Sequence, residues 1–525
     1  MGRGCEHPSH GILYTHIAWM TTRWLFIKNA IANLSKGSAA GIVALLLPPL
    51  LVRHMTAAEY GAWVLVLQAA AYIGYLDFGL QTAIGRYVAY ATEKLDYEQR
   101  NSVFSTAFAG LLAAALLSLV LLLGAVAAVR MVFPSIPADT IPMMRWALLI
   151  LGASFVLGLP ASAWSGVFVG LQRYEIPALV IGGARLISAV GVVLAAFAGR
   201  SIVAMAAIMA TTNVLSYGAQ YAAMRRIVPD VKFSRELVRR ATANELLKYC
   251  FGLTVMSFSM LLVTGLDLIL VGRFQFGAVT AYSVSAAMIT FVSGVLSAIL
   301  NVMMPHAAAL HARRNPGELG RLVIISTQVA VILLIMTGIP PLIYAAPILK
   351  VWIGQQYVQT GQPILVVLLI ANIIRLIGLP YAIVLISTGQ QRLIKASPLT
   401  EGISNLLASV ILGAMMGAIG VALGTLVGSI FSIAAHVFYS MPRTRADIRV
   451  SLREYILSAV LTPLLATTPL LLSAALWISG LSIVARPIVF LPAVGLSLLG
   501  SALLLRRSGV LRIGRAKPAH NSTLE

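Results

Sequence analysis

The sequence predicts an all-α, polytopic membrane protein with about fourteen transmembrane helices. Of its 525 residues, 59% are hydrophobic and only 10% are charged, and the mean hydropathy is +0.90. Soluble domains carry roughly one charged residue in four, so this composition is typical of a protein embedded in a membrane. Apolar windows of roughly 20 residues, the length that crosses a hydrocarbon core about 30 Å thick, recur along the whole sequence.

The apolar windows give the predicted spans in chain order. A helix rises about 1.5 Å per residue, so each window has about the length that a bilayer requires. The predicted spans are Asn29–Val52, Tyr60–Leu80, Val103–Val129, Met144–Val169, Ile176–Ala198, Ile202–Ala223, Tyr249–Val271, Val279–Met304, Leu322–Ala345, Ile364–Ser387, Leu399–Met416, Ile419–Tyr439, Tyr455–Ile478 and Ile483–Leu505.

The distribution of Lys and Arg over the loops sets the orientation. With the N-terminus inside, the cytoplasmic segments hold about 28 of the 38 Lys and Arg residues, and the outer segments hold about 7. We therefore expect a multi-pass protein of the bacterial inner membrane with both termini in the cytoplasm. The net charge of +21 then belongs to loops that meet anionic lipid headgroups, and no soluble basic domain indicates a nucleic-acid partner.

The most basic inner loop, Met224–Lys248, divides the chain and can form an amphipathic helix on the membrane surface. The two halves show a weak internal repeat. In the first half an apolar helix ends at Arg53 and is followed by Tyr60, and in the second half an apolar helix ends at Arg273 and is followed by Tyr282. Interface anchoring of any outer hairpin would give the same pattern. The expected domains are a cytoplasmic N-terminal tail (1–28), an N-terminal six-helix bundle (29–223), a basic cytoplasmic linker (224–248), a C-terminal six-helix bundle (249–440), a cytoplasmic loop (441–454), an extra helix pair (455–505) and a cytoplasmic tail (506–525).

Motifs for catalysis are absent from the sequence. It contains no G-x-x-x-x-G-K-[ST] phosphate loop, no H-E-x-x-H, no G-x-S-x-G and no D-x-D pair. The predicted outer loops are too short to house a glycosyltransferase or ligase site. His306 and His311 are poorly spaced for a metal ion on a helix, and Cys5 and Cys250 form no ligand pattern. We expect no enzyme activity, no metal and no cofactor.

Polar residues inside the predicted spans are candidate site residues, because ionisable side chains are expensive within a bilayer. The candidates for substrate binding are Lys36, Arg185 and Arg375, with the neighbouring amides Asn33 and Asn372. Arginine can hold a phosphate or carboxylate with two parallel hydrogen bonds, so these cations predict a cavity for a phosphate-bearing or acidic-sugar substrate. The alternatives are structural ion pairs with an in-span aspartate, or snorkelling of Lys36 and Arg185 to an interface.

Two in-span aspartates, Asp77 and Asp267, are candidates for binding a coupling ion. Asp77 precedes Phe78-Gly79 at the end of a span, so a packing role at a helix terminus is equally consistent with its position. Asp267 lies about six residues before Arg273 and could instead approach the outer face.

Glycines at four-residue spacing predict close helix packing rather than ligand binding. They occur as Gly37 and Gly41 in the first predicted span, and as Gly420, Gly424 and Gly428 in the twelfth. We expect each of these helices to approach a neighbour at backbone distance.

Several short segments together carry a resemblance to a known family. They are Asn33 through Pro48, Glu59-Tyr60-Gly61-Ala62-Trp63, Leu76-Asp77-Phe78-Gly79-Leu80 with Arg86-Tyr87, Gly170-Leu171-Gln172-Arg173-Tyr174, and Asp267 through Tyr282. Over about Asn29 to Leu505, the chain resembles the polysaccharide flippases, which are the O-antigen and exopolysaccharide repeat-unit translocases of the multidrug/oligosaccharidyl-lipid/polysaccharide exporter superfamily.

The resemblance implies a V-shaped pair of six-helix bundles related by pseudo-twofold symmetry, which works by alternating access. It implies that a polyprenyl-pyrophosphate-linked oligosaccharide moves from the cytoplasmic to the periplasmic leaflet, with coupling to an ion gradient. The implied partners are this lipid-linked oligosaccharide, membrane lipids, and the polysaccharide polymerase and chain-length machinery. Cationic lumen residues in the family match Lys36, Arg185 and Arg375 if these face the lumen.

Two other functions remain open. A multidrug or cation exporter of the same superfamily would be expected to line its cavity with carboxylates, whereas the spans here offer three candidate cations against two acids. An O-antigen polymerase or ligase would make glycosidic bonds at the outer face, and the short outer loops argue against it.

Overall fold

The computed structural model describes residues 45–264, 266–301, 303–313, 316–445, 448, 450–478 and 485–508. Every regular element in these residues is helical, which confirms the predicted all-α class. The N-terminal half contains helical residues 45–52, α2 (Ala57–Ile73), η1 (Gly74–Asp77), α3 (Leu80–Glu93), α4 (Tyr97–Val132), α5 (Thr140–Gly170), α6 (Glu175–Phe197) and α7 (Ile202–Ile227).

A linker with η2 (Arg235–Leu237) leads to α8 (Arg240–Thr264) and the C-terminal half. That half contains α9 (Asp267–Phe274), η3 (Phe276–Ala278), α10 (Val279–Asn301), α11 (Met303–Ala312), α12 (Pro316–Ile343), α13 (Ala345–Ile353), η4 (Gln355–Tyr357), α14 (Val358–Ile377), α15 (Leu379–Ser387), α16 (Gln391–Ile394), α17 (Ala396–Met416), α18 (Ala418–Ala435), η5 (His436–Ser440) and α19 (Met441–Arg443). The last elements are α20 (Leu452–Glu454), η6 (Tyr455–Leu461), α21 (Thr462–Ala466), α22 (Thr468–Ile478) and α23 (Ala485–Arg507).

Eleven of the described helices are long and apolar enough to cross a membrane. The number rises to twelve if the segment from α20 to α22, which is bent by 61°, counts as one span. The predicted first span lies largely in residues 1–44, outside the described residues, and the seventh is divided between two helices. The count of fourteen therefore stays a prediction.

Backbone breaks occur at the end of one predicted span and within another. The window Tyr60–Leu80 ends at such a break, beyond which α3 continues the helical stretch to Glu93. Left-handed backbone at Phe78 (φ 51°) and Gly79 (φ 76°) marks the break. The window Tyr249–Val271 is divided between α8 and α9. Hydropathy reports how apolar a segment is and carries no information on such breaks.

The basic linker does not form the expected surface helix. After α7 the chain contains only the short η2 before α8 starts at Arg240. Pro229 in this segment cannot donate a helical hydrogen bond, which disfavours a continuous helix. Val228 and Val231 are instead buried in a hydrophobic cluster at the end of the N-terminal bundle.

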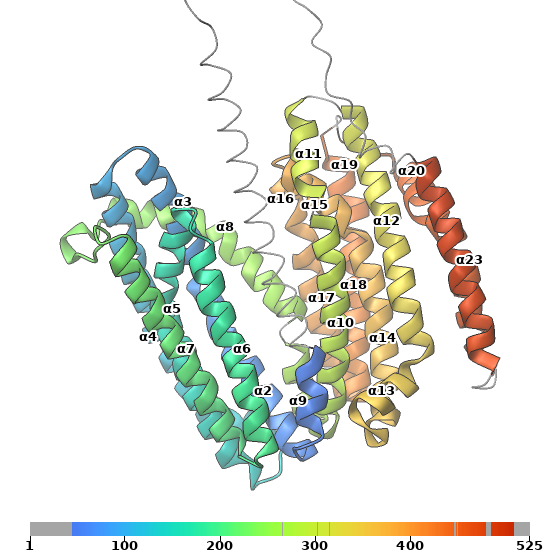
Figure 1. Ribbon diagram of the computed structural model, residues 1–525, viewed down its shortest axis with the longest axis horizontal. Coiled ribbons are helices and arrows are strands. Elements are labelled where there is room, and N and C mark those ends of the chain that lie inside the picture. Colours follow the sequence, from blue (N-terminus) through green and yellow to red (C-terminus); the bar gives the residue numbers. More distant parts are fainter. Residues whose placement is uncertain are drawn as a thin grey trace, which may run out of the picture.

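The helices form two bundles that diverge in a V (Figure 1). Helices α2 to α7 pack with one another on one side, α10, α12, α14, α17 and α18 pack on the other, and α8 contacts both. Where the bundles meet, a single hydrophobic core combines Tyr60 and Trp63 of α2 with Tyr282 of α10 and Leu349 of α13. We refer to this end of the molecule as the closed end.

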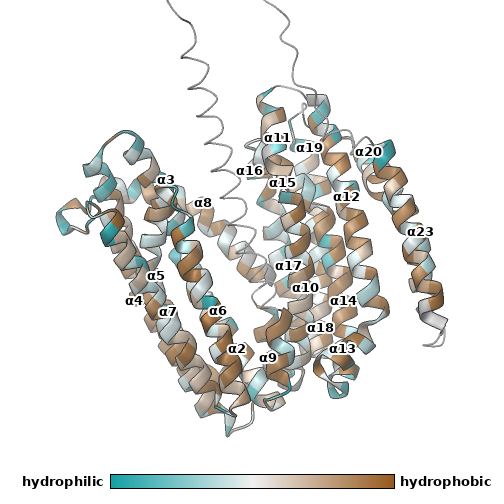
Figure 2. Cartoon of the chain, in the orientation of Figure 1, coloured by the Kyte–Doolittle hydropathy of each residue, from teal (hydrophilic) through white to brown (hydrophobic). Residues whose placement is uncertain are grey.

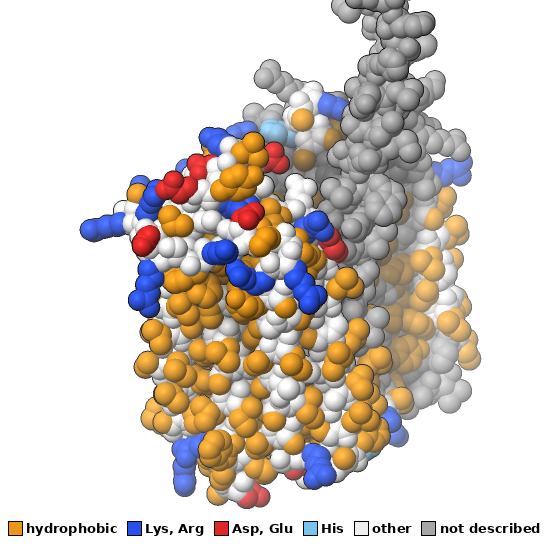
Figure 3. All heavy atoms as spheres, turned by 60° about the vertical axis from the view of Figure 1, so that its left-hand side comes forward, with side chains coloured by type: hydrophobic (Ala, Val, Ile, Leu, Met, Phe, Trp, Pro, Cys, Tyr) orange, Lys and Arg blue, Asp and Glu red, His pale blue; other side chains and the backbone are white. Residues whose placement is uncertain are grey.

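On the face seen in Figure 3, charged side chains gather at the opposite end of the molecule, which is named the basic end. Arg225 and Arg226 lie there, in the last turn of α7. Between the two ends the surface is a hydrophobic band (Figures 2 and 3). Within the band, Leu116 and Val120 of α4 are each 67% exposed, as expected for side chains that face lipid tails.

The glycines of α18 confirm the predicted close packing. A Cβ atom at Gly420 would overlap the carbonyl oxygen of Leu412, and one at Gly424 would overlap Ser409, both on α17. A Cβ at Gly428 would lie 3.0 Å from another α17 carbonyl oxygen. The two helices therefore approach at backbone distance, which only glycine allows here.

Candidate functional site

Two cavities between described helices each include one predicted cation among their lining residues. The C-terminal cavity has a volume of about 280 Å³, and Asp267, Asn372 and Arg375 line it together with Val64 and Gln68 of α2, so it lies where the two bundles meet. The N-terminal cavity has a volume of about 490 Å³, and Arg185 is among its lining residues. Arg185 and Arg375 are thus not brought together in one cavity.

Asp267 is the centre of a hydrogen-bond network in the C-terminal bundle. It is buried, with 8% of its surface exposed, at the start of α9. Its Oδ1 accepts from Asn405 Nδ2 at 3.1 Å, and its Oδ2 accepts from the hydroxyls of Thr425 at 2.9 Å and Tyr282 at 3.3 Å. Ser409 in turn donates to Asn405 Oδ1 at 2.8 Å. Donors from three other helices thus stabilise one buried carboxylate.

Arg375 of α14 is oriented by an amide and paired with a carboxylate. Its Nη2 donates to Asn372 Oδ1 at 2.9 Å, and the Ser293 hydroxyl donates to the same oxygen at 2.8 Å. Its Nη1 lies 3.8 Å from Glu401 Oε1, and the two side chains are 24% and 7% exposed. The guanidinium is therefore held in place and partly neutralised.

Glu401 changes the balance of charge within the spans. It lies inside the predicted window Leu399–Met416 but is not among the predicted site residues. The sequence did indicate Glu401, because an acidic residue close to the start of an apolar window is unusual. The structural alternative for Arg375 was an ion pair with an in-span aspartate, and the structure shows Glu401 as the partner instead. With Glu401 included, the spans contain three candidate cations and three acids, so the number of charges alone no longer favours an anionic cargo.

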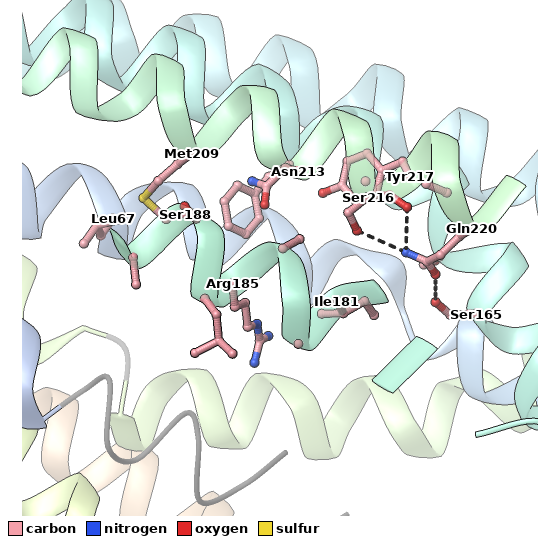
Figure 4. A pocket seen from close by; sticks show the side chains of 18 of the residues that line it. Leu67, Ser165, Ile181, Arg185, Ser188, Met209, Asn213, Ser216, Tyr217 and Gln220 are labelled. Atoms are coloured by element: carbon pink, nitrogen blue, oxygen red, sulfur yellow. Dashed lines mark hydrogen bonds between the residues drawn. The ribbon is translucent and has the colours of Figure 1, made fainter. Parts of the chain in front are cut away.

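The N-terminal cavity lies among α2, α3, α5, α6 and α7 and is mostly uncharged. Gln220 Oε1 accepts a hydrogen bond from the Ser165 hydroxyl, and Asn213 Nδ2 donates to Ser154 at 3.1 Å. The exposed side chain of Arg185 extends from α6 away from Asn213 and Gln220 (Figure 4).

The remaining predicted site residues lie elsewhere. Lys36 and Asn33 are outside the described residues, as are Gly37 and Gly41. Asp77 lies at the break between α2 and α3, where its Oδ1 accepts a 2.9 Å hydrogen bond from the Gly79 N–H. This contact fits the helix-terminus role that was the alternative to ion coupling.

At the closed end, two arginines join the bundles reciprocally. Arg53 Nη2 donates to the carbonyl of Val351 in α13 at 2.8 Å. Arg273 Nη1 of α9 donates to the carbonyls of Met131 and Val132, at the end of α4, at 3.2 and 3.3 Å. Each arginine reaches the last turn of a helix in the other bundle, where carbonyls lack intrahelical partners. Arg53 and Arg273 are the two arginines of the weak internal repeat seen in the sequence.

Comparison with known proteins bears on both the family and the fold. A family model described as "Polysaccharide biosynthesis protein" matches residues 26–311. No curated protein sequence matches the chain.

Among solved structures, one similar fold is "Lipid II flippase MurJ" in an inward closed conformation, with a TM-score of 0.67, 14% identity, and coverage of 92% of this chain and 99% of that one. Another is a multidrug resistance MATE family transporter of the MOP superfamily in an inward-facing conformation, with a TM-score of 0.62, 13% identity, and coverage of 78% and 97%. A MOP superfamily transporter from Pyrococcus furiosus has a TM-score of 0.53, 13% identity, and coverage of 79% and 94%. These likenesses show that the fold is shared.

Proposed function

The chain belongs to the polysaccharide biosynthesis protein family, and from this premise we propose that it is a flippase for lipid-linked oligosaccharides. Its cargo would be a polyprenyl-pyrophosphate-linked repeat unit, moved from the cytoplasmic to the periplasmic leaflet by alternating access and without an enzymatic step. In this proposal the basic end faces the cytoplasm, as the excess of Lys and Arg favours. The polymerase and chain-length machinery would use its product.

The observation that carries the proposal is the arrangement of the two bundles. They are joined at the closed end by a common core and by Arg53 and Arg273, and they diverge toward the basic end (Figure 1). An alternating-access transporter needs such an arrangement, in which contacts at one end break while the other end closes. In the proposed orientation, this structure accepts cargo from the cytoplasmic side.

Arg375 is the proposed contact for the pyrophosphate in the C-terminal bundle. A guanidinium has five N–H donors, and the described contacts of Arg375 are one hydrogen bond and one ion pair, so further donors can bind phosphate oxygens. In this proposal Asn372 keeps the guanidinium of Arg375 oriented. Glu401 limits the attraction between Arg375 and the pyrophosphate, so that the cargo can leave. Lys36, Asn33 and Arg185 remain proposed contacts for the same anionic headgroup.

Asp267 is the proposed coupling-ion site. Its network places the hydroxyl oxygens of Thr425 and Tyr282 beside the carboxylate, and hard cations prefer such oxygen ligands. Either a proton or a sodium ion could neutralise this buried charge. Asp77 is the weaker proposal, because its carboxylate already caps a local turn.

The test is reconstitution of the purified protein in liposomes with labelled polyprenyl-pyrophosphate oligosaccharides, with and without a proton or sodium gradient. We expect the wild type to translocate these lipids and Arg375→Gln to do so more slowly while still folding. Arg321→Gln is the matched control, because Arg321 is exposed on α12 and donates to the carbonyl of Ser508 outside both cavities. Full transport by both Arg375→Gln and Lys36→Gln would reject these residues as cargo contacts.

The second candidate function is export of drugs or other cations, which the acids Asp267 and Glu401 favour. The same liposomes distinguish the two functions. Efflux of organic cations without translocation of any sugar lipid would overturn the flippase proposal.

A further inference from the structure

We infer that the N-terminal cavity is a binding pocket for a sugar residue of the cargo, next to its pyrophosphate. The inference rests on the proposed flippase function and adds a recognition site for the sugar itself. The volume of about 490 Å³ falls within the roughly 300–1,000 Å³ of small-molecule sites.

The lining chemistry of this cavity suits a saccharide. A sugar presents hydroxyl groups that both donate and accept, and uncharged amides and hydroxyls satisfy both roles. Among the described residues that line it, none is acidic and Arg185 is the one with a charge. The other polar side chains of this described lining are uncharged, and they include the amides of Asn213 and Gln220 and the hydroxyls of Ser165, Ser216 and Tyr217.

Trp63 supplies a second, independent observation. Only 1% of its surface is exposed, yet its indole Nε1 has no hydrogen-bond partner in the part of the chain that the structure describes. A buried donor without a partner is costly, so such a group calls for an acceptor that the protein itself does not supply. Trp63 lines the same cavity as the amides of Asn213 and Gln220. A sugar hydroxyl is one acceptor that would satisfy it.

Arg185 fixes how the cargo would lie in the cavity. Its side chain lines the cavity but is exposed, and it extends away from the amides of Asn213 and Gln220 (Figure 4). A phosphate held by this guanidinium would lie at the exposed edge of the cavity, away from those amides, and the linked sugar would extend from there into the cavity. The ring of Tyr217, whose hydroxyl lies close to Gly158, provides an apolar face for the sugar ring.

A hydrated cavity with no ligand is the competing explanation, because water also satisfies buried polar groups. Two neighbouring glycines of α6 allow a matched test. An added Cβ meets no atom within 4 Å at either Gly182 or Gly183, but only Gly182 lines the cavity. Leucine is a better helix former than glycine, so both Gly182→Leu and Gly183→Leu should fold. Gly182→Leu fills the cavity, whereas Gly183→Leu adds the same side chain outside it.

The experiment measures binding of two kinds of probe to the full-length protein in nanodiscs. One probe is polyprenyl pyrophosphate without sugar. The others are polyprenyl-pyrophosphate-linked single sugars, namely a hexose, an N-acetylhexosamine, a 6-deoxyhexose and a hexuronic acid. We expect at least one sugar to tighten wild-type binding by about tenfold over the sugar-free lipid, which is the effect of one or two hydrogen bonds.

Gly182→Leu should abolish this gain without changing the affinity for the sugar-free lipid, and Gly183→Leu should behave as the wild type. Arg185→Gln should weaken binding of both kinds of probe. If no sugar tightens wild-type binding, or if Gly182→Leu retains the gain, the cavity is a hydrated void and the inference is wrong. Transport by the wild type in the liposome assay is a separate result, so a failed pocket and a failed flippase are distinguishable.

Discussion

Removal of the two arginines at the closed end should shift the protein toward a conformation that is open at that end. Arg53→Ala removes one hydrogen bond to a carbonyl of the opposite bundle, and Arg273→Ala removes two. Because both guanidinium groups are exposed, each side contributes about 0.5–1 kcal/mol, the lower part of the range for a hydrogen bond. The double variant therefore loses about 1–2 kcal/mol, which multiplies the relative population of the open conformation by roughly 5- to 30-fold.

Double electron–electron resonance measures this shift directly. Spin labels would be attached to cysteines introduced at Asp139, before α5, and at Gln359, in the first turn of α14, which are exposed positions in different bundles. The background replaces Cys5 and Cys250 with alanine. We expect a longer distance component that grows from the wild type through each single variant to the double variant.

Arg145→Ala is the matched control for this experiment. Arg145 Nη2 donates to the carbonyl of Ala127 at 3.1 Å, so it makes the same kind of bond within one bundle. Its removal should leave the distance distribution unchanged. Identical distributions in the double variant and the wild type, or an equal shift in Arg145→Ala, would refute the reasoning.

Three further predictions concern the C-terminal bundle. Asp267→Asn should remove the dependence of transport on an ion gradient while binding of polyprenyl pyrophosphate persists; unchanged dependence in the liposome assay would exclude Asp267 as the coupling site. Glu401→Gln should free Arg375 and tighten binding of polyprenyl pyrophosphate by about three- to tenfold while slowing turnover, and weaker binding would contradict this role. Gly424→Leu should separate α17 from α18, lower the free energy of unfolding by about 1–3 kcal/mol or more, and lower the melting temperature by several degrees. Gly495→Leu is the control, because an added side chain there enters open space and should leave the melting temperature unchanged.

The membrane class could be predicted from the sequence because the bilayer acts on composition and length, which are properties of short windows. The glycine ridge at Gly420, Gly424 and Gly428 was predictable for the same reason, since one helix carries the whole pattern. The division of the window Tyr249–Val271 between α8 and α9 was not predictable from hydropathy, because that measure does not report where the backbone breaks.

The candidate site was predictable only in part. Asp267 and Arg375 could be selected because a charge inside an apolar window is unusual. Asn372, three residues before Arg375, could be selected with it, but the partners of Asp267 could not be identified, because Asn405 lies 138 positions away in the sequence and is an ordinary polar residue in its own helix. Of the N-terminal cavity, only Arg185 could be selected from the sequence, because the uncharged residues that line it lie on different helices and only packing brings them together.

The short helix α9 gives the closed end a direct mechanical link to the Asp267 network. Its eight residues begin with Asp267 and carry Arg273 in the last turn, so a rigid rod of about 12 Å connects the buried carboxylate to the bonds across the bundles. The bonds of Arg273 end on main-chain carbonyls, so substitution of the Met131 or Val132 side chain leaves the acceptors in place. In the proposed coupling role of Asp267, a displacement of α9 would carry ion binding to the bonds of Arg273 at this end.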